Sequence, residues 1–156
     1  MHTNLCDELA IRYPIFGFTP SPEVAVAISK AGGLGVLGAI RYTDPSELEA
    51  ALTWMDKELD GLPYGVDVVI PHEILPEDRL AELENMIPQQ HRDFVENLLR
   101  QQGVPEVSLA DDGGQAITGW MHAHALEQVE VALRHPIALL ANALGAPPAQ
   151  VIAQCK

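Results

Sequence analysis

Four glycines fall within seven positions, in the segment GGLGVLG that runs from Gly32 to Gly38. Glycine-rich turns can cradle a phosphate when they link a strand to the start of a helix, where main-chain N–H groups converge on an anion. Here the glycines follow a predicted helix and then occupy an apolar run, which is the reverse order. We therefore expect Gly32 and Gly33 to end a helix, and Gly35 and Gly38 to allow a strand to pack closely.

A single carboxylate, Asp67, interrupts the apolar segment PYGVDVVIP. Burying an unpaired charge is costly, so this carboxylate needs solvent or a partner. Two interpretations follow. Asp67 faces a ligand at the end of a strand, or it forms a structural salt bridge or a main-chain hydrogen bond.

The histidines do not form a set of metal ligands. His122 and His124 are two residues apart near a predicted helix start, so they project from different sides of that helix. His91 and His135 stand alone, and we expect them at the surface or capping a turn. The sequence therefore predicts no metal site.

Short apolar runs alternate with amphipathic segments, and these define the elements that must position the residues above. The helices are expected to open with the N-cap and proline pairs Ser21-Pro22 and Asp44-Pro45. The predicted strands span 13–18, 34–40, 63–71 and 136–143, and the predicted helices span 21–31, 44–60 and 122–134, with a last helix from 147. Strand-helix-strand repeats with short connections are typical of a parallel α/β sheet with right-handed crossovers.

The alternation breaks between residues 72 and 119. Two acidic, amphipathic segments at 76–86 and 88–102 predict helices, and 103–119 predicts a polar loop. A plain crossover needs only about 10–12 residues, so we interpret this stretch as an insertion between the third strand and its following helix. The predicted organisation is 12–71 for the first strand and helix units, 72–119 for the insertion and 120–156 for the continuation.

Composition excludes several classes of protein. The 156 residues carry 22 acidic and 9 basic side chains, a formal net charge of −13, without a basic cluster. Such a chain is expected to repel nucleic acid and anionic membranes. We see no signal peptide and no run of about 18 apolar residues, so we expect no membrane contact and a cytoplasmic location. Cys6 and Cys155 match no metal or CxxC spacing, and we expect free thiols.

Taken together, four ordered segments closely resemble the N-terminal half of the nitronate monooxygenase family, formerly called 2-nitropropane dioxygenases. The likeness is to an actinobacterial-type branch with an extra helical insertion. The segments are RYPIFGFTPSPEVAVAISKAGGLGVLGAI, DPSELEAALTWMDKELDGLPYGVDVVIP, MIPQQHRDFVENLL and HPIALLANALGAPPAQVI. The resemblance implies an α/β fold that is the N-terminal half of a TIM (β/α)8 barrel, FMN as cofactor, and an alkyl nitronate or nitroalkane oxidised with O2.

The same resemblance implies which residues face the flavin. The loop after the first strand maps onto Phe16, Gly17 and Phe18, and the end of the third strand maps onto Asp67. The family usually has asparagine at the latter place, so a carboxylate replaces an amide here and only accepts hydrogen bonds when it is ionised. Asn142, at the end of the fourth strand, is expected to reach the flavin or the substrate from the same end of the barrel.

The family's Gly-Gly-His-Thr segment and its glycine-rich phosphate loop do not occur in this sequence. We therefore expect no catalytic base in this chain, and expect the catalytic histidine and the FMN phosphate site to belong to a second half. One alternative is a truncated or split, non-catalytic half-barrel, whose exposed strand edges favour self-association or pairing with the missing C-terminal half. Another is a flavin-dependent enoyl or NADH reductase on the same scaffold.

Overall fold

The computed structural model describes residues 2–70, 86–105 and 117–155. The chain forms two compact units, one made of Met1–His72 with Met121–Lys156 and the other of Glu73–Trp120. The first unit contains the sheet, and the second contains helix α5 (Gln89–Gln101). Within the described segments, no helix is both long enough and apolar enough to cross a membrane.

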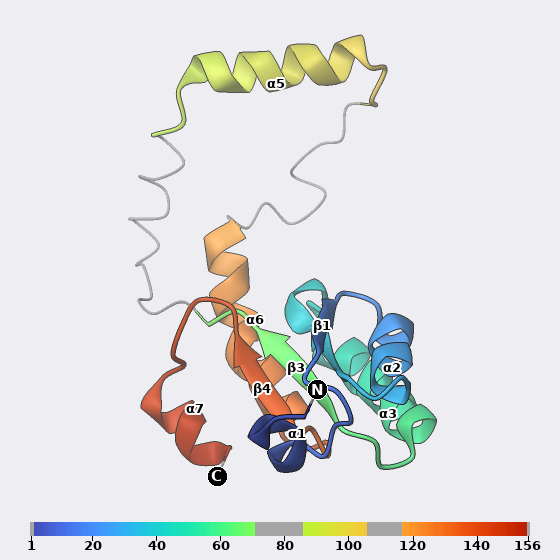
Figure 1. Cartoon of the computed structure of the whole chain (residues 1–156). Coiled ribbons are helices and arrows are strands. Elements are labelled where there is room, and N and C mark those ends of the chain that lie inside the picture. The colour runs from blue at the N-terminus through green and yellow to red at the C-terminus, as the bar shows by residue number, and fades with distance from the viewer. Residues whose placement is uncertain (1, 71–85, 106–116, 156) are drawn as a thin grey trace. The chain divides into compact units, whose positions relative to one another are not determined.

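The first unit is built on a parallel sheet of four strands in the order β1-β2-β3-β4 (Figure 1). Neighbours in the sequence are neighbours in the sheet, and each pairing is parallel. This order is that of consecutive strand and helix units wound in one direction, and it confirms the predicted parallel α/β sheet. The strands are β1 (Phe16–Thr19), β2 (Leu34–Gly38), β3 (Tyr64–Val68) and β4 (Leu139–Asn142).

The helices that connect these strands begin where the sequence predicts caps. Ser21 Oγ accepts the main-chain N–H of Val24, and Asp44 Oδ1 accepts that of Ser46. Each cap satisfies an N–H group that the helix leaves unpaired and stabilises the helix by roughly 1 kcal/mol. The helices that carry or flank the sheet are α1 (Asn4–Glu8), α2 (Pro22–Lys30), the 3-10 helix η1 (Ala39–Arg41), α3 (Pro45–Leu59), α6 (Ile117–Ala132) and α7 (Ala149–Gln154).

The glycine run is part of the scaffold, as predicted. Gly32 has a φ of +97° after the last turn of α2, and the N–H of Gly33 reaches back to the carbonyl oxygen of Ile28, a hydrogen bond that closes helices with a left-handed residue. Gly35 lies under α2, where a methyl group would stand 2.0 Å from the carbonyl oxygen of Ala25. The helix end and the close main-chain approach therefore explain these glycines.

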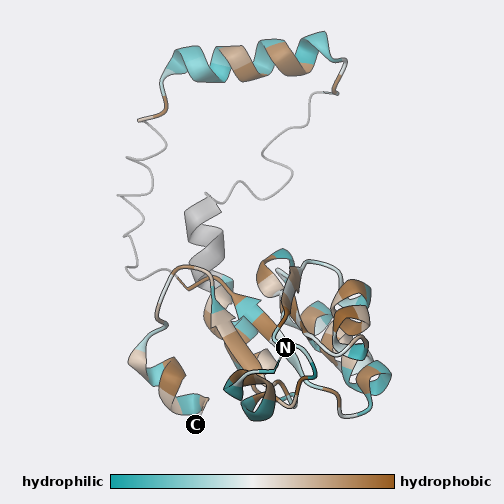
Figure 2. Ribbon diagram, in the orientation of Figure 1, coloured by the Kyte–Doolittle hydropathy of each residue, from teal (hydrophilic) through white to brown (hydrophobic). Residues whose placement is uncertain are grey.

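The two faces of the sheet are covered differently. The larger cluster of buried side chains joins the sheet to α2, α3 and α6, and its strand members are Leu37, Tyr64, Val66, and Val68. The second cluster lies on the opposite face and consists of Cys6, Ile11, Leu34 and Val36. The apolar character of the strands is visible in Figure 2. Because helices cover the outside of a (β/α)8 barrel, the face with the second cluster corresponds to the barrel interior.

Several boundaries differ from the prediction. Helix α6 begins at Ile117, so residues 117–119 are helical where a loop is predicted. Gly119 falls in its first turn, where its cost of about 1 kcal/mol relative to alanine is offset by the turns that follow. Strand β2 ends at Gly38 because the next three residues form η1. The helix predicted at 88–102 is α5, whereas the one predicted at 76–86 lies outside the described residues except at its last position.

Candidate cofactor site

Two aromatic side chains of β1 lie on the barrel-interior face and remain exposed. Phe16 is 43% exposed and Phe18 is 63% exposed, and their spacing of two residues places them on the same face. A methyl group on the intervening Gly17 would lie 2.5 Å from Cδ1 of Ile28, so this glycine makes room for α2 on the opposite face. The exposed aromatic pair therefore offers an apolar surface to a planar ligand.

The ring of Phe18 lies across Gly38 of β2. A methyl group at Gly38 would stand 2.8 Å from Cζ and 2.9 Å from Cε2 of this ring. Glycine is therefore the residue that lets the ring lie close to the sheet. Gly38 is paired with Asp67 in β3, so the ring and the carboxyl group flank the same glycine.

Asp67 lies between Gly38 of β2 and Ala141 of β4. Its side chain is half-buried, and burial raises the pKa of its carboxyl group above the ordinary value with no charged neighbour contributing. Across residues 2–70, 86–105 and 117–155 the carboxyl group has no hydrogen-bond or ion-pair partner. This setting favours the ligand-facing interpretation of Asp67 over the structural salt bridge.

The side-chain amide of Asn142, the last residue of β4, forms hydrogen bonds to main-chain groups. Its Oδ1 accepts the N–H of Ile70 at 2.8 Å, and its Nδ2 donates to the carbonyl oxygens of Ile70 and Gly145 at 3.2 and 3.0 Å. It is paired with Val68, and strand alternation then places its side chain on the helix-covered face, opposite that of Asp67. Asn142 thus joins the main chain after β3 to the turn after β4, and a direct flavin contact stays a prediction.

The loops at this end of the sheet are held by side chains that the sequence prediction missed. Gln128 of α6 is 5% exposed and donates to the carbonyl oxygens of Ala39 and Tyr42 at 3.0 and 2.8 Å, which fixes η1 after β2. Arg41 Nη1 donates to the carbonyl oxygen of Pro20 at 3.1 Å and joins this loop to the one after β1. The sequence signal that could have revealed this role is a glutamine in an apolar helix, because a buried amide needs hydrogen-bond partners.

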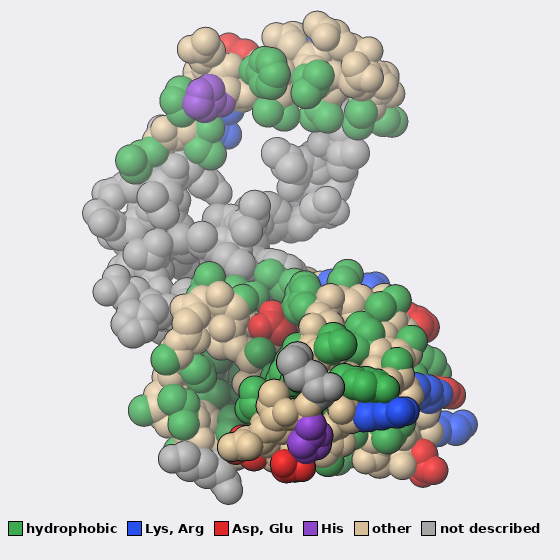
Figure 3. Space-filling view, viewed as in Figure 1, with side chains coloured by type: hydrophobic (Ala, Val, Ile, Leu, Met, Phe, Trp, Pro, Cys, Tyr) green, Lys and Arg blue, Asp and Glu red, His purple; other side chains and the backbone are tan. Residues whose placement is uncertain are grey.

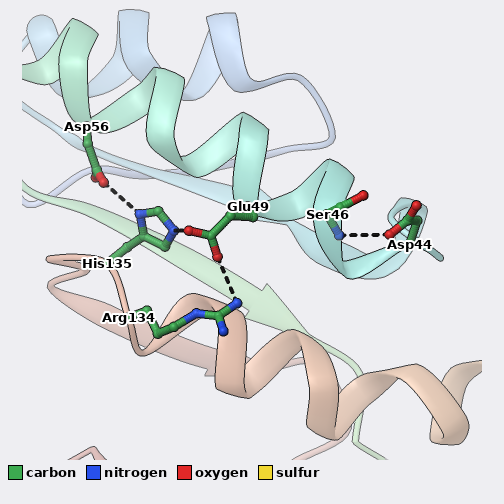
Figure 4. A network of polar contacts seen from close by, with 6 residues as sticks. All are labelled: Asp44, Ser46, Glu49, Asp56, Arg134 and His135. Atoms are coloured by element: carbon green, nitrogen blue, oxygen red, sulfur yellow. Dashed lines mark hydrogen bonds and ion pairs between the residues drawn. The ribbon is translucent and has the colours of Figure 1, made fainter.

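The side chain of His135 is buried, so of the two expected settings, the surface and a turn cap, the surface one is wrong. Figure 4 shows its ring between two carboxylates. Its side chain is 6% exposed and lies between two carboxylates of α3, with Nδ1 2.6 Å from Asp56 Oδ2 and Nε2 3.3 Å from Glu49 Oε1. The hydroxyl group of Tyr64 donates to Asp56 at 2.6 Å, and Arg134 contacts Glu49 at 2.8 Å. Because Tyr64 is the first residue of β3, this network lies at the amino ends of the strands, away from the candidate site.

Known proteins of similar sequence are longer than this chain. No protein-family model matches it. The chain is 35% identical over 159 residues to Rv1533 of Mycobacterium tuberculosis, named as a monooxygenase, and 30% identical over 131 residues to a Staphylococcus saprophyticus protein named as a nitronate monooxygenase. These matches cover 97% and 69% of this chain but 42% and 36% of the two relatives, so the chain spans about two fifths of their length.

Among solved structures, the chain is similar to nitroalkane oxidase from Streptomyces ansochromogenes, with a TM-score of 0.63 and 22% sequence identity. The likeness covers 97% of this chain and 39% of that one. It confirms the predicted fold class, the N-terminal half of a TIM (β/α)8 barrel with parallel strands and helices.

Proposed function

We propose that this chain, which belongs to the nitronate monooxygenase family, supplies the flavin-contacting part of an FMN-dependent oxidoreductase that oxidises alkyl nitronates with O2. One structural observation supports the location of the site: Phe16 and Phe18 are exposed on the barrel-interior face, beside the half-buried Asp67. Because the chain spans 42% of its mycobacterial relative, the activity is proposed for the completed barrel.

The residues at this site fit a flavin ring. Aromatic side chains stack on planar rings and contribute about 0.5–1.5 kcal/mol beyond the burial of area. Asp67 can hydrogen-bond to the polar edge of such a ring at the carboxyl end of β3, which is the end where barrel enzymes build their active sites. Gly17 lies between the two rings, and its lack of a side chain lets α2 pack behind them. Asn142 acts through the main chain that it holds. FMN, when bound, supplies the electron acceptor for the nitronate.

The base that takes the carbon-bound proton of a nitroalkane is proposed to come from outside this chain. The side chain of His135 is buried and contacts carboxylates of Glu49 and Asp56 at the amino ends of the strands, away from the proposed flavin site. The Gly-Gly-His-Thr segment that carries the family's histidine is not in the sequence. The chain's own residues therefore hold the ring and exclude water from one of its faces, while proton transfer and phosphate binding are assigned to the second half.

Flavin binding by the 156-residue chain tests the proposed site. Titration should quench the fluorescence of FMN in a saturable way, and Phe18→Ala should weaken binding by about tenfold through loss of stacking. Phe94→Ala is the matched control, since Phe94 belongs to α5 and is 66% exposed, close to the 63% of Phe18. Equal affinities of the two variants, or no quenching by any protein, would contradict the proposal. Turnover of a nitronate by the chain alone would show that the second half is dispensable.

We also propose that the barrel-interior face is covered by a partner, either a second copy or the rest of the barrel. Figure 3 shows hydrophobic side chains gathered on the viewed side of the first unit. In the described sheet β1 and β4 are edge strands, whose free N–H and C=O groups can pair with another strand. Sedimentation should show self-association that grows with concentration, and a clean monomer with a cooperative melt would count against it. The exposed large apolar residues of this unit include Ile15, Phe16, Phe18 and Leu144.

A cytoplasmic location is proposed together with this function. Cys6 and Cys155 are free thiols, as the sequence predicts, with Cys6 buried and Cys155 exposed. Free thiols are typical of reducing compartments, where disulfides do not persist. Recovery of the tagged chain in an oxidising compartment upon fractionation of its source cells would argue against this location.

A further inference from the structure

Asp67 is an ionisable group on the surface of the candidate site. Its neighbours in the sheet, Gly38 and Ala141, offer no side-chain donor, and the nearby ring of Phe18 is apolar. The sequences of β1, β2 and β4 contain no charged residue, so none of these strands presents a charge to it. Asp67 is therefore a carboxyl group without an ionic partner in the described part of the chain.

A carboxyl group in this setting keeps its proton to a higher pH than the same group in water does. Burial raises the pKa of Asp67, because apolar surroundings disfavour the carboxylate and no basic group compensates. A planar ring stacked on Phe18 would cover the carboxyl group further and increase the cost of ionisation. The uncharged acid carries a hydrogen-bond donor as well as acceptors, as an amide does, whereas the carboxylate only accepts.

Resting on the function proposed above, we propose that Asp67 contacts the flavin ring as an uncharged acid that donates a hydrogen bond to a ring acceptor. Ring binding and retention of the carboxyl proton are then coupled. At pH values between the pKa of Asp67 in the free chain and its pKa in the ring-bound chain, binding takes up one proton, and the apparent Kd rises by up to about tenfold per pH unit. The pair of Phe18 and Asp67 thereby selects flat heteroaromatic rings that present an acceptor at the edge.

Riboflavin binding by the whole chain, measured between about pH 5 and about pH 9, tests this coupling. Riboflavin carries the ring without the phosphate, whose own ionisation near pH 6 would add a second proton. Calorimetry in two buffers of different ionisation enthalpy counts the protons, and the wild type should take up about one within the pH interval in which its affinity falls. Asp67→Asn keeps a donor and an acceptor at every pH, so it should bind with no proton uptake and no pH dependence. Asp67→Leu has neither group and should bind roughly 2- to 12-fold more weakly than Asp67→Asn.

Two results would overturn the role of Asp67 and leave the ring site standing. One is a pH dependence and proton uptake in Asp67→Asn equal to those of the wild type, and the other is equal affinity of Asp67→Asn and Asp67→Leu. Failure of the proposed function looks different, because neither the wild type nor any variant would then bind riboflavin at any pH, and the role of Asp67 would fall with it. Circular dichroism of each variant verifies that the chain remains folded.

Discussion

Gly35 is the position in the sheet where one methyl group should cost most. It lies in β2 beneath α2, and a Cβ there would stand 2.0 Å from the carbonyl oxygen of Ala25, 2.6 Å from its carbonyl carbon and 2.8 Å from its Cα. Ordinary contacts between such atoms are about 3.5 Å, so α2 would have to move by roughly 1.5 Å. Because the opposing atoms are main chain, no change of rotamer can relieve the clash.

The expected loss follows from comparison with Gly17, which is paired with Gly35 in the sheet and also lies under α2. A methyl group at Gly17 would meet Cδ1 of Ile28 at 2.5 Å, which is the far end of a flexible side chain. Overpacking costs about 1–3 kcal/mol, and we expect Gly35→Ala to lower the free energy of unfolding by at least about 3 kcal/mol. Gly17→Ala should change the free energy of unfolding by less than about 1 kcal/mol. The cost of moving Ile28 is offset by the roughly 0.5–1 kcal/mol of stability that is gained when a strand glycine is replaced by alanine.

Urea denaturation of the wild type and the two variants measures this difference, provided that the m values agree. The midpoint of Gly35→Ala should fall well below that of Gly17→Ala. Stabilities within about 0.5 kcal/mol of each other would refute the reasoning, because they would show that α2 does not approach β2 as closely as the structure places it. A lower m value in Gly35→Ala alone would show instead that α2 has detached from the sheet in the folded state.

Three further predictions concern His135, Gln128 and Asp67. His135→Leu should lower the free energy of unfolding by about 1–3 kcal/mol, because it leaves two partly buried carboxylates of α3 without the imidazole between them. Arg134→Ala removes an exposed ion pair and should lower it by less than about 1 kcal/mol. Equal losses in thermal melts of the two variants would show that the burial of the His135 side chain is irrelevant. Gln128→Leu should lower the free energy of unfolding by about 2–4 kcal/mol and speed hydrogen exchange at the amide of Tyr42, since two carbonyl oxygens around η1 lose their donor. An unchanged exchange rate would contradict this role of Gln128. Burial raises the pKa of Asp67 in the folded chain above its pKa in the unfolded chain. The uncharged acid therefore contributes stability that is fully present below the pKa of the unfolded chain and is lost as the pH rises through the pKa of the folded chain. Asp67→Asn should therefore match the wild type near pH 3 and melt higher near pH 8, and a constant difference at both pH values would exclude ionisation as the cause.

Local chemistry explains why much of the fold could be predicted from the sequence. The caps at Ser21 and Asp44 act on N–H groups within three residues of themselves, and Gly32 ends α2 through its own φ. Apolar runs bounded by these signals then locate the four strands to within a few residues. The order of the strands follows because short connections between parallel strands leave few topologies.

The contacts that the sequence did not reveal join residues far apart in the chain. His135 meets a carboxylate 79 residues away, and Gln128 reaches a carbonyl oxygen 89 residues away. No periodicity or spacing relates such pairs, because they depend on how α6 and α3 pack on the same face of the sheet. Asn142 shows the same limit within the candidate site. Its position at a strand end could be predicted, but its hydrogen bonds to the main chain of Ile70 depend on the register of β3 against β4.

The two ends of the sheet differ in whether their ionisable side chains have ionic partners, and this difference supports the location of the site. At the amino ends, the buried side chain of His135 lies between two carboxylates, and Tyr64 adds a further hydrogen bond to one of them. At the carboxyl ends, Asp67 has no partner in the described residues and Phe18 keeps 63% of its surface exposed. Evolution toward stability alone would pair the carboxylate or replace it, since an unpaired half-buried charge costs free energy in the folded chain. An acid that is kept beside an exposed aromatic ring is therefore better explained by a ligand that completes both contacts than by a role in folding.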